Sequence, residues 1–316
     1  MLAASASLLN VKVVILDAGE HGPAKQVVAS PNTQLAHIDG SFSDPEKIRE
    51  LASKVDVLTV EIEHVDTTAL DEIRVASEGK SFAIHPSPST VQIIQDKYRQ
   101  KTHLSSHDLP ISEFVPVESS IESIVAVAEK LGLPLMLKSR TLAYDGRGNF
   151  VLREIGQAQE AITALGNRPL YAEKWVPFVK EIAVMVVRTA DGQVQSYPPV
   201  ETVHKNNICH LVFSPLRSRD ASLTSRIRTV AEKAIKTFTG AGIFGVEMFL
   251  MEDGMSLFQT SFYFYFSDVF EKGTFTSTRS HLGRTTQVTT PLKHVKHRST
   301  RTIYVLFYRC RWDPLR

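Results

Sequence analysis

The chain has 316 residues, 43% of them hydrophobic and 22% charged, which is typical of a globular protein with a sizeable core. No stretch reaches the roughly 18 to 20 apolar residues of a membrane helix, and the start, MLAASASLLN, lacks the features of a secretory signal. The only cysteines, Cys209 and Cys310, are too few for a disulfide framework or a multi-cysteine metal site. We therefore expect free thiols and a cytoplasmic location.

Charge is unevenly distributed along the chain. The formal net charge is +2, but residues 255–316 hold ten Lys or Arg against three Asp or Glu, which leaves −5 for residues 1–254. The same tail packs seven Phe or Tyr into residues 258–270 and shows neither helical nor strand periodicity. Its two closely spaced histidines, His294 and His297, are not expected to form a metal site. We expect a poorly ordered, basic tail.

The first part of the chain has the pattern of a parallel α/β unit. Two apolar, β-branched runs, residues 11–17 and 54–65, predict strands. Between them Asp44 is a suitable helix cap, and Pro45 suits the first helical position. A strand, a helix and a strand in this order favour a parallel sheet.

A Pro/Ser loop, residues 85–90, opens a helix that the pattern extends to residue 108, and a second helix ends at Gly132. Later segments alternate between strands and helices without an internal repeat. The strands are expected at 133–138, 149–153, 170–176, 181–188 and 243–250, with a helix at 223–239. The predicted domains are an α/β domain at 1–88, an α+β domain at 89–254 and the tail at 255–316.

Lys138 ends an apolar strand and is followed by the loop AYDGRGN, residues 143–149. A lysine at the edge of a cleft would bind an anion, and a glycine-rich loop can turn its backbone N–H groups toward a phosphate. The alternative is a solvated lysine followed by an ordinary hairpin turn, and the residues alone leave both open.

Three acids and a histidine are further candidates. Glu173 and Glu181 lie in alternating strands and could accept hydrogen bonds from a ribose or adenine, or could simply face solvent. Glu247 lies in an apolar strand, where a carboxylate needs a metal ion such as Mg²⁺ or a buried lysine. His204, taken alone, is expected to be structural.

Several blocks occur in the order of one known family. They are VKVVILDA, SPNTQLAHIDGSF, VLTVEIEHVD, HPSPSTVQIIQDKYRQK, LKSRTLAYDGRGNF, YAEKWVPFVKE and GIFGVEMFL. From Val11 to Gly254 the chain resembles the ATP-grasp half of fungal phosphoribosylaminoimidazole carboxylase, the 5-(carboxyamino)imidazole ribonucleotide synthase. The fold this implies is α/β and α+β: a truncated Rossmann-like N-terminal domain followed by an incomplete ATP-grasp domain.

The resemblance implies an enzyme of purine biosynthesis that uses ATP and Mg²⁺. ATP would phosphorylate bicarbonate to carboxyphosphate, and the amine of aminoimidazole ribonucleotide would then take up the carboxyl group. The partners implied are these small molecules, with no nucleic acid and no membrane, and a homo-oligomer is left open.

Residue roles follow from the matching motifs. Tyr144 and Arg147 would act in catalysis and, with Glu63 and as second choice Glu61, would face the imidazole nucleotide. Glu247 would bind Mg²⁺. The residues implied in ATP binding are Lys97, Lys138, Tyr144, Asp145, Gly146, Arg147, Gly148, Asn149, Glu173, Lys174, Trp175, Val176, Glu181 and His204.

Two departures from the family keep alternatives open. The chain starts after the family's first strand and glycine-rich turn, and Gln259 and Thr260 stand where the family has Asn and a second acidic Mg²⁺ ligand. The alternatives are an inactive nucleotide-binding remnant, a tail that arises from a faulty gene model, and another ATP-grasp carboxylate-amine ligase.

Overall fold

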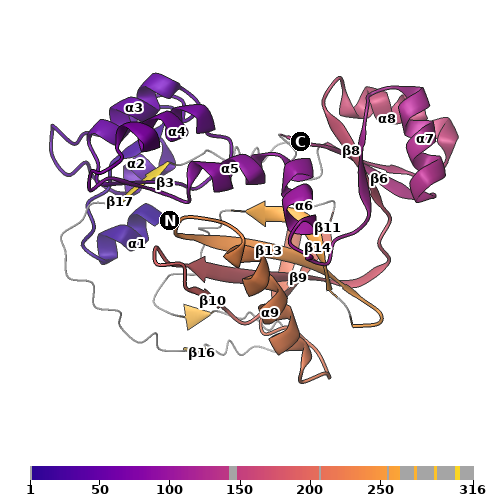
Figure 1. Cartoon of the computed structure of the whole chain (residues 1–316). Helices are drawn as coiled ribbons and strands as arrows, with labels where there is room; N and C mark the ends of the chain where they lie inside the picture. The colour runs from indigo at the N-terminus through magenta and orange to yellow at the C-terminus, as the bar shows by residue number, and fades with distance from the viewer. Residues whose placement is uncertain are drawn as a thin grey trace.

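We analysed the chain in a computed structural model, which describes residues 2–141, 148–205, 208–254, 256–263, 274–275, 288–289 and 303–306. Figure 1 shows an N-terminal α/β part on one side, a small α+β part on the other, and a larger sheet below them. None of the helices in these residues is long and apolar enough to cross a membrane.

The N-terminal part is a parallel sheet of five strands with helices around it. Across the sheet the order is β2 (Ile38–Asp39), β1 (Ile15–Asp17), β17 (Ile303–Leu306), β3 (Val57–Val60) and β4 (Ala83–His85). The helices are α1 (Leu2–Leu8), α2 (Pro23–Val27), α3 (Pro45–Ser53) and α4 (Thr67–Ala76). Leu16 and Leu58 of the sheet and Leu51 of α3 are fully buried in its core. The predicted parallel α/β unit is therefore confirmed.

Helix α3 begins as the sequence predicts. The side chain of Asp44 accepts hydrogen bonds from the backbone N–H groups of Glu46 and Lys47, and Pro45 is the first helical residue. Proline has no N–H, so at this position it leaves no donor unsatisfied, and a cap of this kind stabilises a helix by about 1 kcal/mol.

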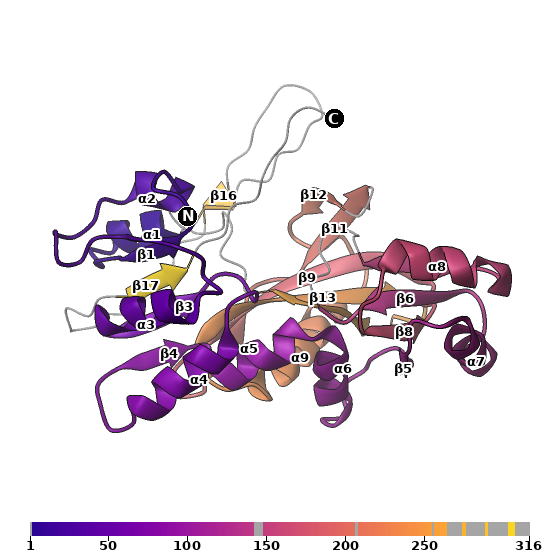
Figure 2. The same ribbon diagram turned by 90° about the horizontal axis from the view of Figure 1, so that it is seen from above.

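The central strand of the N-terminal sheet comes from the C-terminal tail. Strand β17 pairs with β1 on one side and with β3 on the other, both in parallel (Figures 1 and 2). The sequence pattern did not predict this strand, because a four-residue apolar run carries no information about distant partners. The tail also supplies β14 (Ser256–Tyr263) and the two-stranded ribbon of β15 (Thr274–Phe275) and β16 (Val288–Thr289). The tail's expected poor order stays a prediction.

Two helices connect the N-terminal sheet to the rest. They are α5 (Pro88–Gln95) and α6 (Lys97–Ser105). We predicted a single helix between the loop at residues 85–90 and residue 108. The structure divides it at Asp96, which has extended backbone angles. The Asp96 side chain accepts hydrogen bonds from the N–H groups of Tyr98 and Arg99, so it caps α6, and it also binds Arg140. The domain limits at 88 and 254 stay predictions.

The small part is a four-stranded antiparallel sheet with helices on one side. Its strands, in order across the sheet, are β5 (Phe114–Val117), β8 (Leu170–Lys174), β6 (Leu135–Ser139) and β7 (Asn149–Leu152). The helical segments are α7 (Ile121–Leu131), η1 (Ile155–Gln157) and α8 (Ala158–Leu165). Gly132 ends α7 at a φ of 79°, a conformation that favours glycine, as predicted. The sheet and these helices bury an apolar core of their own.

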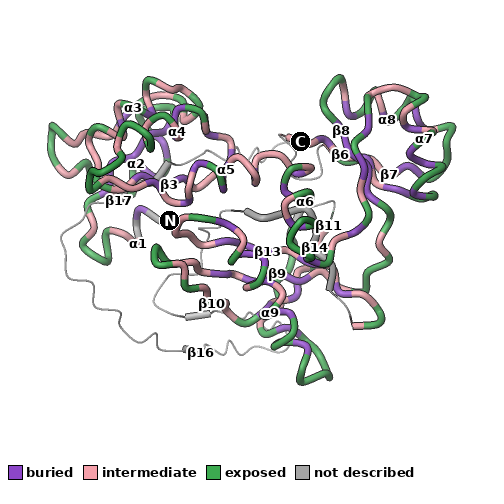
Figure 3. Tube along the Cα trace, in the orientation of Figure 1, coloured by how far each residue is buried: buried purple, intermediate pink, exposed green. Residues whose placement is uncertain are grey.

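The larger sheet is antiparallel. Its order is β12 (Ile208–Phe213), β11 (Val200–Lys205), β9 (Phe178–Arg188), β13 (Gly242–Met251) and β14, with β10 (Val194–Ser196) beside β9. Helix α9 (Leu223–Lys236) packs on β9 and β10. From Val246 to Met251 the residues of β13 alternate between buried and half-buried, and the tube in Figure 3 is coloured by this burial. Phe244, Val246 and Met248 face the core, and Glu247 points to the opposite face.

Candidate functional site

Helix α6 lies between the two antiparallel sheets (Figures 1 and 2), and one of its faces is polar and buried. This face carries Lys97 and, about one turn later, Gln100 and Lys101. Each of the three is at most 6% exposed. Three polar side chains are costly to bury unless other polar groups face them. The acids of the neighbouring strands supply such groups.

Glu173, near the end of β8, lies between two lysines. Its Oε1 is 3.2 Å from Nζ of Lys101, and its Oε2 is 3.2 Å from Nζ of Lys138 on β6. Lys101 Nζ also donates a hydrogen bond of 3.1 Å to Oγ of Ser112. Burial lowers the pKa of Lys101, and the charge of Glu173 opposes this effect.

Glu63, which follows β3, lies beside Lys97. Its Oε1 is 4.0 Å from Nζ of Lys97, and both side chains are at most 10% exposed. Burial lowers the pKa of Lys97, while Glu63 and Glu247 act to raise it. Glu61, the second choice for the imidazole nucleotide, has a pKa raised to about 7 by burial. The structure thus brings Glu63 next to a predicted ATP ligand.

Two further acids share one face of the larger sheet. Glu181 on β9 pairs with Phe249, and Glu247 on β13 pairs with Ala183, so the two carboxylates are diagonal neighbours. Burial and the nearby charge of Glu181 raise the pKa of Glu247 to about 7, against the effect of Lys97 and Lys138. Nδ1 of His204 on β11 faces Oε2 of Glu181 in an ion-pair arrangement.

The acidic pair fits a divalent cation in its chemistry. Carboxylate oxygens are the ligands that Mg²⁺ prefers, and a cation would oppose both the burial and the repulsion by Glu181 that raise the pKa of Glu247. Within the residues described, however, no three His, Cys, Asp or Glu side chains converge as a metal site. Strand pairing of Val246 with Phe262 and of Met248 with Phe258 places residues 259–261 across from Glu247. Gln259 and Thr260 add no carboxylate there.

The other predicted residues lie at the end of β8, at the start of β7 and outside the described residues. Lys174 and Trp175 are exposed at the end of β8, and Lys174 Nζ lies 3.8 Å from Oε2 of Glu113. Gly148 and Asn149 lie at the start of β7, where Asn149 pairs with Lys138. Residues 142–147 lie outside the described chain, so Tyr144, Asp145, Gly146 and Arg147 stay predictions.

Sequence reasoning missed Lys101. The signal was present, because Lys101 follows Lys97 by four residues and therefore lies on the same face of a helix. A charged helix usually faces solvent, however, and only the packing shows that this face is buried.

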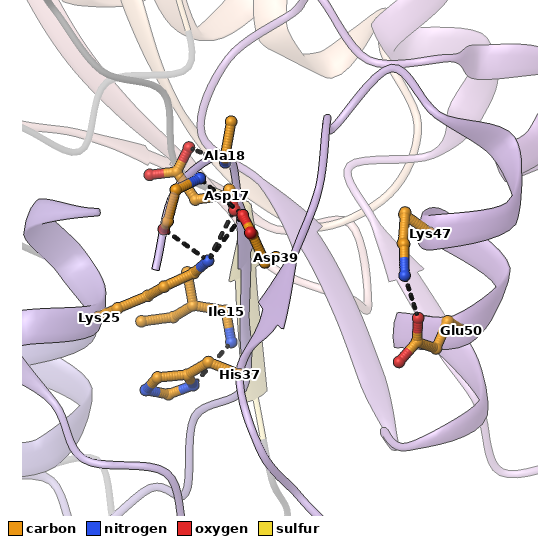
Figure 4. Close-up of polar contacts among 9 residues, drawn as sticks. Ile15, Asp17, Ala18, Lys25, His37, Asp39, Lys47 and Glu50 are labelled. Carbon is orange, nitrogen blue, oxygen red and sulfur yellow. Dashed lines mark hydrogen bonds and ion pairs between the residues drawn. The ribbon is translucent and has the colours of Figure 1, made fainter. Parts of the chain in front are cut away.

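A second polar cluster lies at the carboxyl ends of β1 and β2 (Figure 4). Lys25 Nζ donates hydrogen bonds of 2.7 Å to the carbonyl of Asp17 and 3.0 Å to that of Gly19, and it lies 3.8 Å from Asp39. Its side chain is only 5% exposed, so we interpret the cluster as one that holds the loop after β1 in place.

Comparisons with known proteins agree with this architecture. A family model described as the ATP-grasp domain matches residues 102–260, and one described as the ribonucleotide synthetase pre-ATP-grasp domain matches residues 1–95. The chain therefore belongs to the ATP-grasp family.

The relatives are more specific. The chain is 55% identical over 254 residues to phosphoribosylaminoimidazole carboxylase of Ogataea methanolica, covering 80% of this chain and 45% of the relative. A crystal structure of carboxyaminoimidazole ribonucleotide synthase from Aspergillus clavatus complexed with ATP has a TM-score of 0.77 and 45% identity, over 83% of this chain and 66% of that one. The complex of the same organism's enzyme with ADP and 5-aminoimidazole ribonucleotide has a TM-score of 0.76 and 43% identity, with the same coverage. The chain thus spans less than half the length of the curated fungal relative.

Proposed function

We propose that this chain binds ATP between the two antiparallel sheets and uses it to carboxylate aminoimidazole ribonucleotide with bicarbonate. One observation carries the proposal: the ammonium of Lys97 of α6 lies 4.0 Å from Glu63, and that of Lys138 of β6 lies 3.2 Å from Glu173. Two lysines with little exposed surface thus face acids from other elements. The relatives named for this reaction, and their complexes with ATP, ADP and 5-aminoimidazole ribonucleotide, support the same assignment.

The two lysines would bind the phosphates. Phosphoryl transfer requires positive charge around the transferring group more than it requires a nucleophilic side chain, and a partly buried ammonium supplies it without solvent screening. Glu247 would hold Mg²⁺, whose charge would offset that of the phosphates.

The remaining residues would orient the two organic groups. We assign Glu173 with the segment that follows it to the adenine, and Glu181 with His204 to the nucleoside. Glu63, which lies 4.0 Å from Lys97, would face the imidazole nucleotide, so the acceptor would lie on the N-terminal side of the phosphates. Tyr144 and Arg147 would close over the site, because carboxyphosphate formed from bicarbonate would otherwise be lost to water.

The test has two stages. Isothermal titration with ATP, with and without Mg²⁺, measures binding, and we expect binding in both cases with a weaker Mg²⁺ effect than two carboxylates would give. ADP release is then measured with aminoimidazole ribonucleotide and bicarbonate together and with each alone. Release that requires both substrates supports the proposal, and a chain that does not bind ATP contradicts it.

A second candidate is a nucleotide-binding protein without turnover. The observation in its favour is that Gln259 and Thr260, not an acid, lie across from Glu247. It predicts ATP binding with no substrate-dependent ADP release. A third, another carboxylate-amine ligase, predicts ADP release with a different acid or amine in the same assay.

We also propose a cytoplasmic location. Sedimentation of the purified chain would measure its oligomeric state.

A further inference from the structure

Asp96 and Arg140 form an ion pair where helix α6 meets the end of strand β6. Nε of Arg140 lies 3.1 Å from each carboxylate oxygen of Asp96, and Nη2 donates a further hydrogen bond to Oδ2. Oδ1 of the same carboxylate accepts hydrogen bonds from the backbone N–H groups of Tyr98 and Arg99, at 3.0 and 3.1 Å. One side chain therefore both caps α6 and binds Arg140.

Each member of this pair lies next to a lysine of the candidate site. Lys97 follows Asp96 directly, and its backbone N–H donates a hydrogen bond of 2.8 Å to the carbonyl of Arg140. Lys138 lies two residues before Arg140, in β6. The ion pair and the backbone hydrogen bond thus join the two segments that carry the lysines.

An aromatic ring also contacts the guanidinium. Cζ of Arg140 lies 4.9 Å from the centroid of the Tyr98 ring. That ring meets Phe114 of β5 edge-on, with centroids 5.4 Å apart, and Tyr171 of β8 at 6.2 Å. A planar guanidinium that contacts both a carboxylate and an aromatic ring is restricted in orientation, so the pair fixes a direction as well as a distance.

The two lysines belong to parts of the molecule with separate apolar cores. Leu104 of α6 is buried in the core that includes residues of the N-terminal and the larger sheet, whereas Leu135 and Leu137 of β6 are buried in the core of the small sheet. Hydrophobic burial is not directional, so it does not by itself fix the position of one core relative to the other. Hydrogen bonds depend on distance and angle, and those between Asp96 and Arg140 lie at this boundary.

We propose that Asp96 and Arg140 are positioning residues that set the spacing between the ammonium groups of Lys97 and Lys138, and with it the fit of the site to a chain of phosphates. The inference rests on the proposed function, because it concerns the same two lysines. Breaking the pair should weaken the binding of the phosphates and leave that of the nucleoside nearly unchanged.

Loss of the pair should displace the start of α6 without releasing the helix. About one turn further along α6, the ammonium of Lys101 lies 3.2 Å from Glu173 of the small sheet, so a second ion pair crosses the same boundary. The Arg140 side chain is 28% exposed, and that of Asp96 is 16% exposed. Substitution at either position therefore leaves no closed cavity in an apolar core, and we expect the variants to fold.

The experiment uses two variants that change the charge in opposite directions. Arg140→Met removes a positive charge and keeps most of the apolar stem, whereas Asp96→Asn removes a negative charge. Asparagine caps helices as well as aspartate does, but the NH₂ group that replaces one oxygen cannot accept a hydrogen bond from Arg140. The dissociation constants of ATP and of adenosine are measured in Mg²⁺ for each chain, by competition with a fluorescent ATP analogue.

Both variants should lower the preference for ATP over adenosine about tenfold, because both break the contact that sets the spacing. A direct effect of charge on the phosphates would instead weaken ATP binding in Arg140→Met and strengthen it in Asp96→Asn. A purely structural role would weaken the binding of both ligands by the same factor. In the double variant the preference should fall no further than in either single variant, because the same contact is already broken.

Arg226→Met is the matched control. Nη2 of Arg226 lies 2.6 Å from Oδ2 of Asp220, whose Oδ1 accepts a hydrogen bond of 2.8 Å from the N–H of Ser222, just before α9. This is also an Asp–Arg pair at the start of a helix, but α9 packs on the face of the larger sheet opposite to that of Glu247. We expect the ratio of the two dissociation constants to stay as in the wild type.

The outcomes separate the two proposals. An ATP preference that is unchanged or higher in Asp96→Asn overturns the inference, as does an equal loss of both ligands or an equal fall in Arg226→Met. If thermal unfolding shows that either variant does not fold, Arg140→Lys decides: it keeps the charge without the two-point contact, and an unchanged preference there overturns the inference. A wild-type chain that binds no ATP overturns the proposed function instead.

Discussion

The buried acids beside α6 and those on the larger sheet differ in their charged neighbours. On the side of α6 and the small sheet, Glu173 has a lysine 3.2 Å from each oxygen, and Glu63 has one at 4.0 Å. On the side of the larger sheet, burial and then the nearby charge of Glu181 raise the pKa of Glu247. The first side is neutralised by the protein itself. On the second side Glu181 faces His204, and Lys97 and Lys138 act on Glu247, whose pKa nevertheless stays raised, so this is the side that an added cation would change more.

The largest expected effect concerns the side of α6 and the small sheet, where lysines face Glu63 and Glu173. Lys138→Met should weaken ATP binding about 100-fold, because it removes a partly buried cation at the phosphates. Equilibrium titration with ATP measures the change. Adenosine should bind with nearly unchanged affinity, and an equal loss for adenosine and ATP would place Lys138 away from the phosphates.

The next largest effect tests the acidic side. Thr260→Glu adds a carboxylate at a position that strand pairing sets across from Glu247. We expect ATP affinity in Mg²⁺ to rise about tenfold, because a second anionic oxygen completes the ligand set, with no gain in the presence of EDTA. Thr260→Gln is the control for side-chain size. A gain without Mg²⁺ would separate the effect from metal binding.

A smaller effect concerns pH and stability. The folded-state pKa of Glu247 is raised from 4.5 to about 7, so the folded chain holds the proton more tightly than the unfolded chain does. The ionised carboxylate therefore costs stability: the cost is absent below about pH 4.5, grows as pH rises toward 7 and is constant above that.

Without divalent cation, Glu247→Gln should accordingly melt a few degrees above the wild type at pH 8 and at the same temperature near pH 4.5. Thermal unfolding at both pH values measures this. Glu61→Gln is a useful control, because burial also raises the pKa of Glu61 to about 7, and the charge of Glu181 is not among the causes. Only Glu247→Gln should lose the stabilisation by Mg²⁺ and ATP.

The smallest effect is expected for an exposed ion pair at the end of β8. Lys174 and Glu113 are both more than half exposed and 3.8 Å apart. Lys174→Ala should change the free energy of unfolding by less than about 0.5 kcal/mol, because solvent screens such pairs. Denaturant unfolding of this variant and of Glu113→Ala measures the change. A large loss of unfolding free energy in either variant would mean that this exposed pair does contribute to stability.

Much of the fold was predictable, because it depends on local signals. Asp44 with Pro45, and Gly132, mark helix ends through their own backbone chemistry. The division between α5 and α6 was missed because Asp96 lies within a continuous helical pattern, and its cap and its ion pair with Arg140 are visible only in three dimensions.

The candidate site was predictable in part. Lys97 was found only through the order of the sequence blocks, which also decided between the alternatives that the residues alone left open for Lys138, Glu173 and Glu247. Glu247 illustrates the limit: a metal ligand and a buried ion-pair partner have the same sequence pattern, and its pKa of about 7 depends on neighbours from other elements. Lys101 was missed because burial of a helix face depends on how the small sheet packs.

The origin of strand β17 has a consequence for biosynthesis. A ribosome makes β1 and β3 early and residues 303–306 only after the whole ATP-grasp region, yet these residues pair with both strands. The nascent N-terminal part therefore has two parallel strands separated by the width of the one still to come, and pairings between distant segments form slowly. During this interval the inner edges of β1 and β3 are open to other strands, so chaperone demand during synthesis should depend on how fast the tail emerges.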